Sequence, residues 1–313
     1  MKPIVVLLLT LVCLVMPLVG ECLATYHPAL GKWLNRDLPG QSDDPNLYSY
    51  VSSNPGLYCD PAGRYKLLYH GQMIAKTMHA RGYQAQAIQA THRGSLFTDI
   101  MGNSVFEIAP ASQRFTPQDA LQKSRDVLRG MHFDNLKDYA AVSAAWKRLE
   151  EMAKKSCEPC DPLKILTNWG SLLHAVQDFY AHSNWAEVMA GSGYGKDNMP
   201  TWDSMQAALA DPETRAAAQA LLDKVYTGSF PGSPDDPKSH SRMNKDDPTR
   251  PNYAESRAAA DAATAEWLNR LEKLAGEECV KRLKAWDDPR AVAQIMRDVH
   301  EMEALAEAAG QWK

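Results

Sequence analysis

The run Leu172-Leu-His-Ala-Val-Gln-Asp-Phe-Tyr-Ala-His182 places two imidazoles and a carboxylate at helical spacing inside an apolar stretch. At about 100° per residue, His174, Asp178 and His182 fall within roughly 80° of one another on a helix, so all three can point into one cavity. Histidine nitrogens and aspartate oxygens are ligands for first-row metals such as zinc. One such residue alone would be a surface or core residue, but three on one stripe predict a metal-binding helix face.

Composition sets the broad class of the protein. The 313 residues are 45% apolar, which is enough for a buried core in one large or two ordinary domains. The formal net charge is −4. This balance argues against a general duplex-DNA binder, because such proteins present a basic stripe to the phosphates.

The N-terminal residues have the pattern of a secretory signal peptide. Lys2 precedes an apolar run over residues 4–19, and Cys22-Leu-Ala24 offers small residues at the −3 and −1 positions of a cleavage site. An uncleaved anchor is the alternative, but the run is shorter than the ~20 residues that span a membrane. We therefore expect residues 1–24 to be removed and the protein to be secreted or periplasmic.

Four cysteines remain after this cleavage, namely Cys59, Cys157, Cys160 and Cys279. An even number fits an oxidising compartment. The Cys157-Glu-Pro-Cys160 motif is compatible with a tight disulfide, a redox pair or half of a zinc site. A Cys₄ zinc site needs a second close pair, which the chain lacks, so the disulfide is favoured.

A change of character near residue 63 marks a domain boundary. Residues 26–63 are rich in turn-forming residues with one short apolar alternation over 46–51, which predicts strands and turns. Helical periodicity follows to the end of the chain. We expect three parts: a signal peptide (1–24), a β/turn-rich segment (25–63) and a helical metal-binding domain (64–313).

Seven helices are predicted in the third part. Thr116-Pro117 and Asp161-Pro162 mark two helix starts, because a capping side chain precedes a proline suited to the first turn. Residues 227–252 form a connection too long for a simple turn, so this segment is either functional or a mobile surface loop; we would seek further ligands in its stretch His240-Ser-Arg-Met-Asn-Lys-Asp-Asp247. The predicted helices cover approximately residues 65–81, 117–129, 136–155, 163–189, 201–226, 253–275 and 289–309.

The turn-rich segment resembles the end of the Rhs (rearrangement hotspot) repeat-associated core. The pieces that carry the resemblance are Gly31-Lys-Trp-Leu-Asn-Arg-Asp37, Asn46-Leu-Tyr-Ser-Tyr-Val51, Asn54-Pro55 and Asp60-Pro-Ala-Gly63. In that family the region after the last of these motifs is a variable effector, often a toxin. The resemblance implies that residues 64–313 occupy the effector position, with a cognate immunity protein as a partner. The shell repeats are absent, so we expect residues 25–63 to be a remnant.

The helical part resembles the Het-C branch of the zinc-dependent phospholipase C and single-strand nuclease superfamily. The resemblance rests on Asp99, His132-Phe-Asp-Asn135, Leu173 to Trp185 and Asn244-Lys-Asp246. Members are mainly α, multi-helix bundles that hold up to three zinc ions in one cleft and cut phosphodiester bonds. The resemblance implies that residues 64–313 form a mainly α bundle of phospholipase C type with one to three zinc ions.

The same resemblance assigns the ligands. Asp99 and Asp178 take the catalytic positions, with Asp178 bridging two ions and Asp99 as candidate general base. Asn244 stands where the family has a glutamate and is a weaker, neutral oxygen ligand. The implied first site is Asp99, His132, His174 and Asp178; the second is His182, His240 and Asn244; and His70 contributes to a third.

The expected function is a secreted zinc-dependent hydrolase of phosphodiester bonds, acting as a toxin or effector. A phospholipid or membrane surface is favoured over single-stranded nucleic acid, because net acidity disfavours a polyanion. Tyr180, Trp185, Tyr194 and Trp202 can line a lipid groove or stack bases equally well. The non-enzymatic alternative is a metal-stabilised Het-C-like interaction module, which Asn244 favours; a helical domain without metal is the third. The oligomeric state is left open.

Overall fold

The computed structural model describes residues 26–27, 32–33, 68–101, 131–157, 159–230, 233, 235–246 and 248–293. The chain divides into two compact units, Met1–Tyr65 and Lys66–Lys313. The described part of the first unit is one antiparallel pair, β1 (Tyr26–His27) and β2 (Lys32–Trp33), in which Tyr26 faces Trp33. The predicted signal peptide and the rest of the Rhs-like segment lie outside the described residues.

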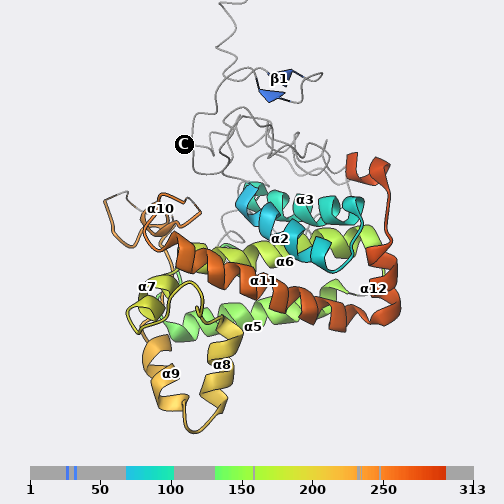
Figure 1. The fold of residues 1–313 in the computed structure, drawn as a ribbon. Helices are drawn as coiled ribbons and strands as arrows, with labels where there is room; N and C mark the ends of the chain where they lie inside the picture. The colour runs from blue at the N-terminus through green and yellow to red at the C-terminus, as the bar shows by residue number, and fades with distance from the viewer. Residues whose placement is uncertain are drawn as a thin grey trace, which may run out of the picture. The chain divides into compact units, whose positions relative to one another are not determined.

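The second unit is built from helices, which confirms the mainly α prediction. Of those described, α6 lies at the centre and contacts α2, α3, α5 and α11, which surround it in Figure 1. The helices are α2 (Leu68–Ala80), α3 (Ala85–Met101), α5 (Tyr139–Ser156), α6 (Pro162–His182), α7 (Trp185–Ala190), α8 (Trp202–Ala210), α9 (Arg215–Leu222), α10 (His240–Met243), α11 (Tyr253–Ala275) and α12 (Glu277–Lys284).

Helix α6 is buried along almost its whole length. It begins as the sequence predicts: Asp161 accepts a hydrogen bond from the N–H of Lys164, and Pro162 occupies the first turn. Every residue from Ile165 to His182 is buried. A helix that is enclosed on all sides carries its polar side chains into the interior, where each needs a partner.

Two glycines let α3 and α6 cross at very short range. A Cβ atom on Gly94 of α3 would lie 1.9 Å from the carbonyl oxygen of Thr167, and one on Gly170 of α6 would lie 1.9 Å from that of Thr91. No side chain fits at either point, so the backbones themselves are in contact. Helix α3 escaped prediction because this packing uses glycine and small polar residues rather than an apolar stripe.

Aromatic rings fill the core on another side of α6. The ring of Trp146 stacks on that of Trp202, with centroids 5.5 Å apart. Tyr180 and Trp185, whose rings lie 5.8 Å apart, are fully buried. The expected lipid groove or base-stacking surface is therefore wrong for these residues: only Tyr194 of the proposed set is partly exposed.

Two long predicted helices are broken in the structure. The first stops at His182, because Asn184 turns away to exchange hydrogen bonds with the chain at Lys224 and Tyr226. The second is broken between α8 and α9 by the turn that contains Pro212. By contrast, α11 has the predicted limits of 253–275.

The disulfide differs from the one favoured on sequence grounds. Cys160 pairs with Cys279 of α12, and their Cα atoms are 6.0 Å apart. Cys157 ends α5 as a buried free thiol, 3.9 Å from the carbonyl oxygen of Leu271 on α11. The chain turns between α5 and α6, so neighbouring cysteines point to different helices and the pairing of Cys157 with Cys160 is wrong.

Within the described residues, none of the helices combines the length and apolar character that crossing a bilayer would require.

Candidate metal centre

Buried acidic and histidine side chains meet at the end of α6 where that helix passes α2 and the loop before α5. They form three overlapping groups in which the potential ligand atoms lie within 4.8 Å of one another. Group A is His70, His174 and Asp178; group B is Asp178, His182 and Asp246; group C is Asp134, His182 and His240.

Group A joins α2 to α6. The Nε2 atom of His70 lies 3.3 Å from Oδ1 of Asp178, and Nε2 of His174 lies 3.1 Å from Oδ2 of the same carboxylate. The rings of His70 and His174 are 4.5 Å apart. His174 and Asp178 are one helical turn apart, so both side chains project from the same face, as the spacing predicts.

A hydrogen-bond chain sets the orientation of the His70 ring. The hydroxyl of Thr264 donates to the carbonyl oxygen of Ala260 at 2.7 Å, so its oxygen accepts from Nε2 of Gln177 at 3.0 Å. The amide oxygen of Gln177 then accepts from Nδ1 of His70 at 2.8 Å. Nδ1 therefore donates to this amide oxygen, and the opposite nitrogen, Nε2, faces Asp178.

His132 joins group A from the loop before α5. Its Nδ1 atom lies 2.5 Å from Oδ2 of Asp178 and 3.4 Å from Nε2 of His174. Its Nε2 atom donates to the carbonyl oxygen of Thr98 on α3 at 3.2 Å. A backbone carbonyl thus holds the far nitrogen, which leaves Nδ1 directed at the carboxylate.

Groups B and C share His182. Its Nε2 atom lies 3.1 Å from Oδ2 of Asp246, and its Nδ1 atom lies 3.8 Å from Oδ2 of Asp178. In group C, Nδ1 of His240 lies 2.8 Å from Oδ1 of Asp134, and the rings of His182 and His240 are 4.0 Å apart. The shared residues make the three groups one continuous cluster.

An unusual backbone carries His132 and Asp134 to different groups. Phe133 and Asn135 both have positive φ, 50° and 62°, a region that a bulky residue rarely adopts. The Phe133 ring is completely buried, and the Asn135 amide exchanges hydrogen bonds of 2.7 and 3.0 Å with the backbone of Phe230. These contacts hold a strained segment of the kind that gathers at functional sites.

The electrostatics of the cluster favour a bound cation. Burial alone would raise the pKa of Asp178, but the charges of His174 and His182 and a hydrogen bond from His132 hold it well below its ordinary value. Burial lowers the pKa of His182, yet Asp178 and a hydrogen bond to Asp246 outweigh this effect and raise it to about 10. The Asp178 carboxylate is thus charged and draws positive charge to the site.

Two buried ligand atoms have no hydrogen bond within the described residues. They are Oδ1 of Asp178 and Nδ1 of His182, and both side chains are almost fully enclosed. A buried polar atom without a hydrogen-bond partner costs free energy. The Nε2 atom of His70 faces the same Oδ1 atom of Asp178, and the set of His and Asp side chains suits a metal ion.

The structure brings together most of the residues that the sequence assigned to a metal site: His70, His132, His174, Asp178, His182 and His240. The side chain of Asp99 lies outside the described set, so its assigned part stays a prediction. The side-chain oxygen of Asn244 accepts from the N–H of Asp246 at 2.7 Å. In this contact it orients a neighbouring carboxylate, and its own ligand role stays a prediction.

Sequence reasoning missed two carboxylates as ligands. Asp134 and Asp246 lie in segments that the sequence had singled out, but their partners are 106 and 64 residues away. Only the fold shows that residues so far apart in the sequence lie close together. The buried ring of His92 occupies the space that a Cβ atom on Gly71 would need. His92 does not belong to any of the three groups.

Neither a protein-family model, nor a curated protein, nor a solved structure matches the chain.

Proposed function

We propose that this protein is a zinc-dependent phosphodiester hydrolase of phospholipase C type, secreted by way of residues 1–24. The observation that carries the proposal is the sharing of ligands. Asp178 belongs to groups A and B, and His182 belongs to groups B and C. Shared ligands hold ions only a few ångströms apart, and pairs of ions at such spacing are typical of enzymes that cut phosphate esters.

The donor set favours zinc among common metals. Five of the side chains in and beside the three groups are imidazoles: His70, His132, His174, His182 and His240. Calcium and magnesium prefer oxygen ligands throughout, whereas zinc takes mixed nitrogen and oxygen sets.

Zinc ions, when bound, supply positive charge that neutralises a phosphoryl group, and they acidify water near neutral pH. The chain supplies orientation. Gln177 and the carbonyl of Thr98 hold two imidazoles by their far nitrogens. Asp178 is charged and faces histidines on both sides, so it suits the bridging position. Asp99 remains the candidate general base.

The substrate test compares phosphatidylcholine vesicles with single-stranded DNA, each with and without a chelator. We expect one of them to be cut by the full chain only when zinc is present. The Asp178→Asn variant keeps the side-chain shape, and we expect it to lose at least a hundredfold in rate. Turnover of neither substrate with a zinc-filled protein would argue against hydrolysis.

A second function has a specific observation in its favour. The residues of group A are each 4% exposed or less, and a structural metal site is closed whereas a catalytic one stays open. The protein would then be a metal-stabilised interaction module, with a membrane surface or an immunity protein as its partner. An Asp178→Ala protein that unfolds would support this role; a folded, inactive one would support catalysis.

A further inference from the structure

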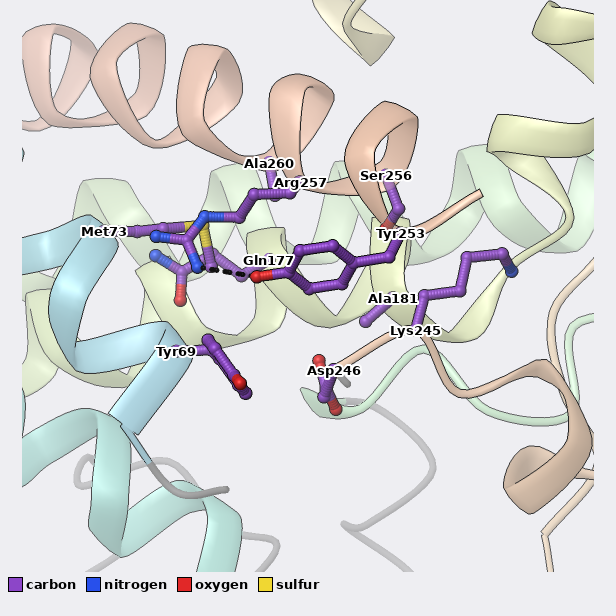
Figure 2. Close-up of a pocket in the computed structure, with 10 residues that line it drawn as sticks. All are labelled: Tyr69, Met73, Gln177, Ala181, Lys245, Asp246, Tyr253, Ser256, Arg257 and Ala260. Carbon is purple, nitrogen blue, oxygen red and sulfur yellow. Dashed lines mark hydrogen bonds between the residues drawn. The ribbon is translucent and has the colours of Figure 1, made fainter. Parts of the chain in front are cut away.

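A pocket opens directly beside the metal centre, between α2, α6 and α11 (Figure 2). Asp246 lines it and also belongs to group B. Gln177 lines it and also holds His70. A group bound to the metal centre on this side would therefore face the pocket, whose remaining wall includes Tyr69 and Arg257.

Arg257 brings a positive charge to this wall with only loose contacts of its own. Its Nε atom lies 3.5 Å from Oδ1 of Asp261 and makes no hydrogen bond there. One terminal nitrogen lies 3.5 Å from the Tyr253 hydroxyl, and the guanidinium lies 5.9 Å from the centre of the Tyr69 ring. Hydrogen bonds to oxygen are ordinarily 2.7–3.2 Å long, so most of its five donors have capacity left.

The carboxylate of Asp261 has a second partner. Nζ of Lys76 lies 3.2 Å from its Oδ2 atom. Arg270, on the same helix, is held by short hydrogen bonds of the kind that a structural arginine makes. It donates to Glu150 at 3.0 Å and to Asp203 at 2.8 Å. The contacts of Arg257 with Asp261 and Tyr253 are longer, at 3.5 Å each, so its guanidinium retains donor capacity for a ligand.

The other cation that lines the pocket is turned away from it. Nζ of Lys245 donates to the carbonyl oxygens of Ser183 and Met243, and it pairs with Glu187. Figure 2 shows the Lys245 side chain running along one edge with its nitrogen pointing outward, while Arg257 reaches toward Tyr253. Among the described lining residues, the guanidinium is thus the cation left to meet a ligand in the pocket.

We propose that Arg257 contacts a non-bridging phosphoryl oxygen of the substrate and is a substrate-binding residue on the side of the centre where Asp246 lines the pocket. The inference rests on the proposed function. A guanidinium donates two parallel hydrogen bonds to a phosphoryl group, and this geometry is lost with lysine. The same charge disfavours a quaternary ammonium group in this pocket, so the part of the substrate that lies here is anionic.

The test is calorimetric titration of inorganic phosphate into the full chain, after dialysis against zinc and removal of unbound metal. Arg257→Gln is compared with the matched control Arg270→Gln and with Arg257→Lys. Zinc content is measured for each protein, and turnover of bis(4-nitrophenyl) phosphate is followed in parallel. We expect Arg257→Gln to keep wild-type zinc content, to bind phosphate roughly tenfold to a hundredfold more weakly and to raise KM, with Arg257→Lys restoring part of the affinity and the control unchanged.

The outcomes separate this inference from the proposed function. Phosphate affinity of Arg257→Gln within twofold of wild type would overturn the inference, and so would absence of phosphate binding by wild type or loss of zinc from the variant. Normal turnover by Arg257→Gln would leave the hydrolase standing without this residue. If phosphate binding depends on Arg257 but the protein cuts no ester, the inference about Arg257 is supported and the proposed hydrolase activity is contradicted.

Discussion

At the scale of single residues, the metal centre depends on groups that orient the ligands as much as on the ligands. Gln177 lies beside Asp178 in the sequence, and its residue type alone does not indicate a role in metal binding. Its amide connects His70 on α2 to Thr264 on α11, so it fixes the orientation of one imidazole. Residues of this kind escape sequence reasoning because their partners lie on other helices.

Replacing Gln177 should weaken metal binding without removing a ligand. In Gln177→Met the amide that holds His70 is lost, and comparable losses of outer partners lower metal affinity by roughly 10- to 100-fold. Competition against a chromophoric chelator measures the change. Gln219→Met, on α9 and bonded to Asp223, is the matched control and should bind zinc as the wild type does. Equal zinc affinity of the wild type, Gln177→Met and Gln219→Met would show that Gln177 does not contribute to metal binding.

Metal binding should release protons near neutral pH. The pKa of His182 is raised to about 10, so its imidazole is charged at pH 7 in the absence of metal. A metal ion binds the neutral ring, hence the apparent zinc affinity must rise as pH increases toward 10. Calorimetry at pH 7 in buffers of different ionisation enthalpy counts the protons. We expect His182→Asn to release about one fewer proton than wild type, whereas identical counts would contradict this assignment.

At the scale of elements, some helices were predictable and others were not. The span of α11 and the start of α6 follow from periodicity, capping and proline. Helix α3 was missed because it packs through Gly94 and small polar residues, which leave no hydrophobic period. The break after His182 arises from hydrogen bonds between Asn184 and a distant segment, which no local pattern contains.

The crossing of α3 and α6 should be intolerant of even one methyl group. In Gly94→Ala or Gly170→Ala the new Cβ would lie 1.9 Å from a backbone carbonyl oxygen, so the helices must separate. Overpacking of this kind costs about 3 kcal/mol or more in the free energy of unfolding. Denaturant unfolding measures it, with Gly195→Ala as control because its nearest atom would be 3.9 Å away. Stability losses below 0.5 kcal/mol at the crossing would show that the helices are not in backbone contact.

At the scale of the whole molecule, the site is a product of tertiary structure. Spacing alone identified the His174, Asp178 and His182 stripe. The carboxylates of Asp134 and Asp246 come from loops far along the chain, so no spacing rule reaches them. The same limit applies to the cysteines, because a disulfide pairing does not follow from sequence when several partners are available.

The disulfide between Cys160 and Cys279 should contribute substantially to global stability. It joins residues 119 apart and ties the start of α6 to α12. The chain-entropy model for a loop of this size predicts that Cys160→Ser or Cys279→Ser loses about 5 kcal/mol. Denaturant unfolding under oxidising conditions measures the loss, and a reducing agent should abolish the difference between wild type and variants. If neither the cysteine substitutions nor the reducing agent alters the free energy of unfolding, the pairing of Cys160 with Cys279 is contradicted.

The central claim is that buried histidines and aspartates hold more than one metal ion, and zinc stoichiometry tests it most directly. Elemental analysis of the purified full chain after dialysis against zinc should give two or more ions per chain. His174→Ala should give fewer, while His79→Ala, which alters an exposed residue of α2, should match the wild type. A chain that holds no zinc, or the same amount with and without His174, would contradict the account.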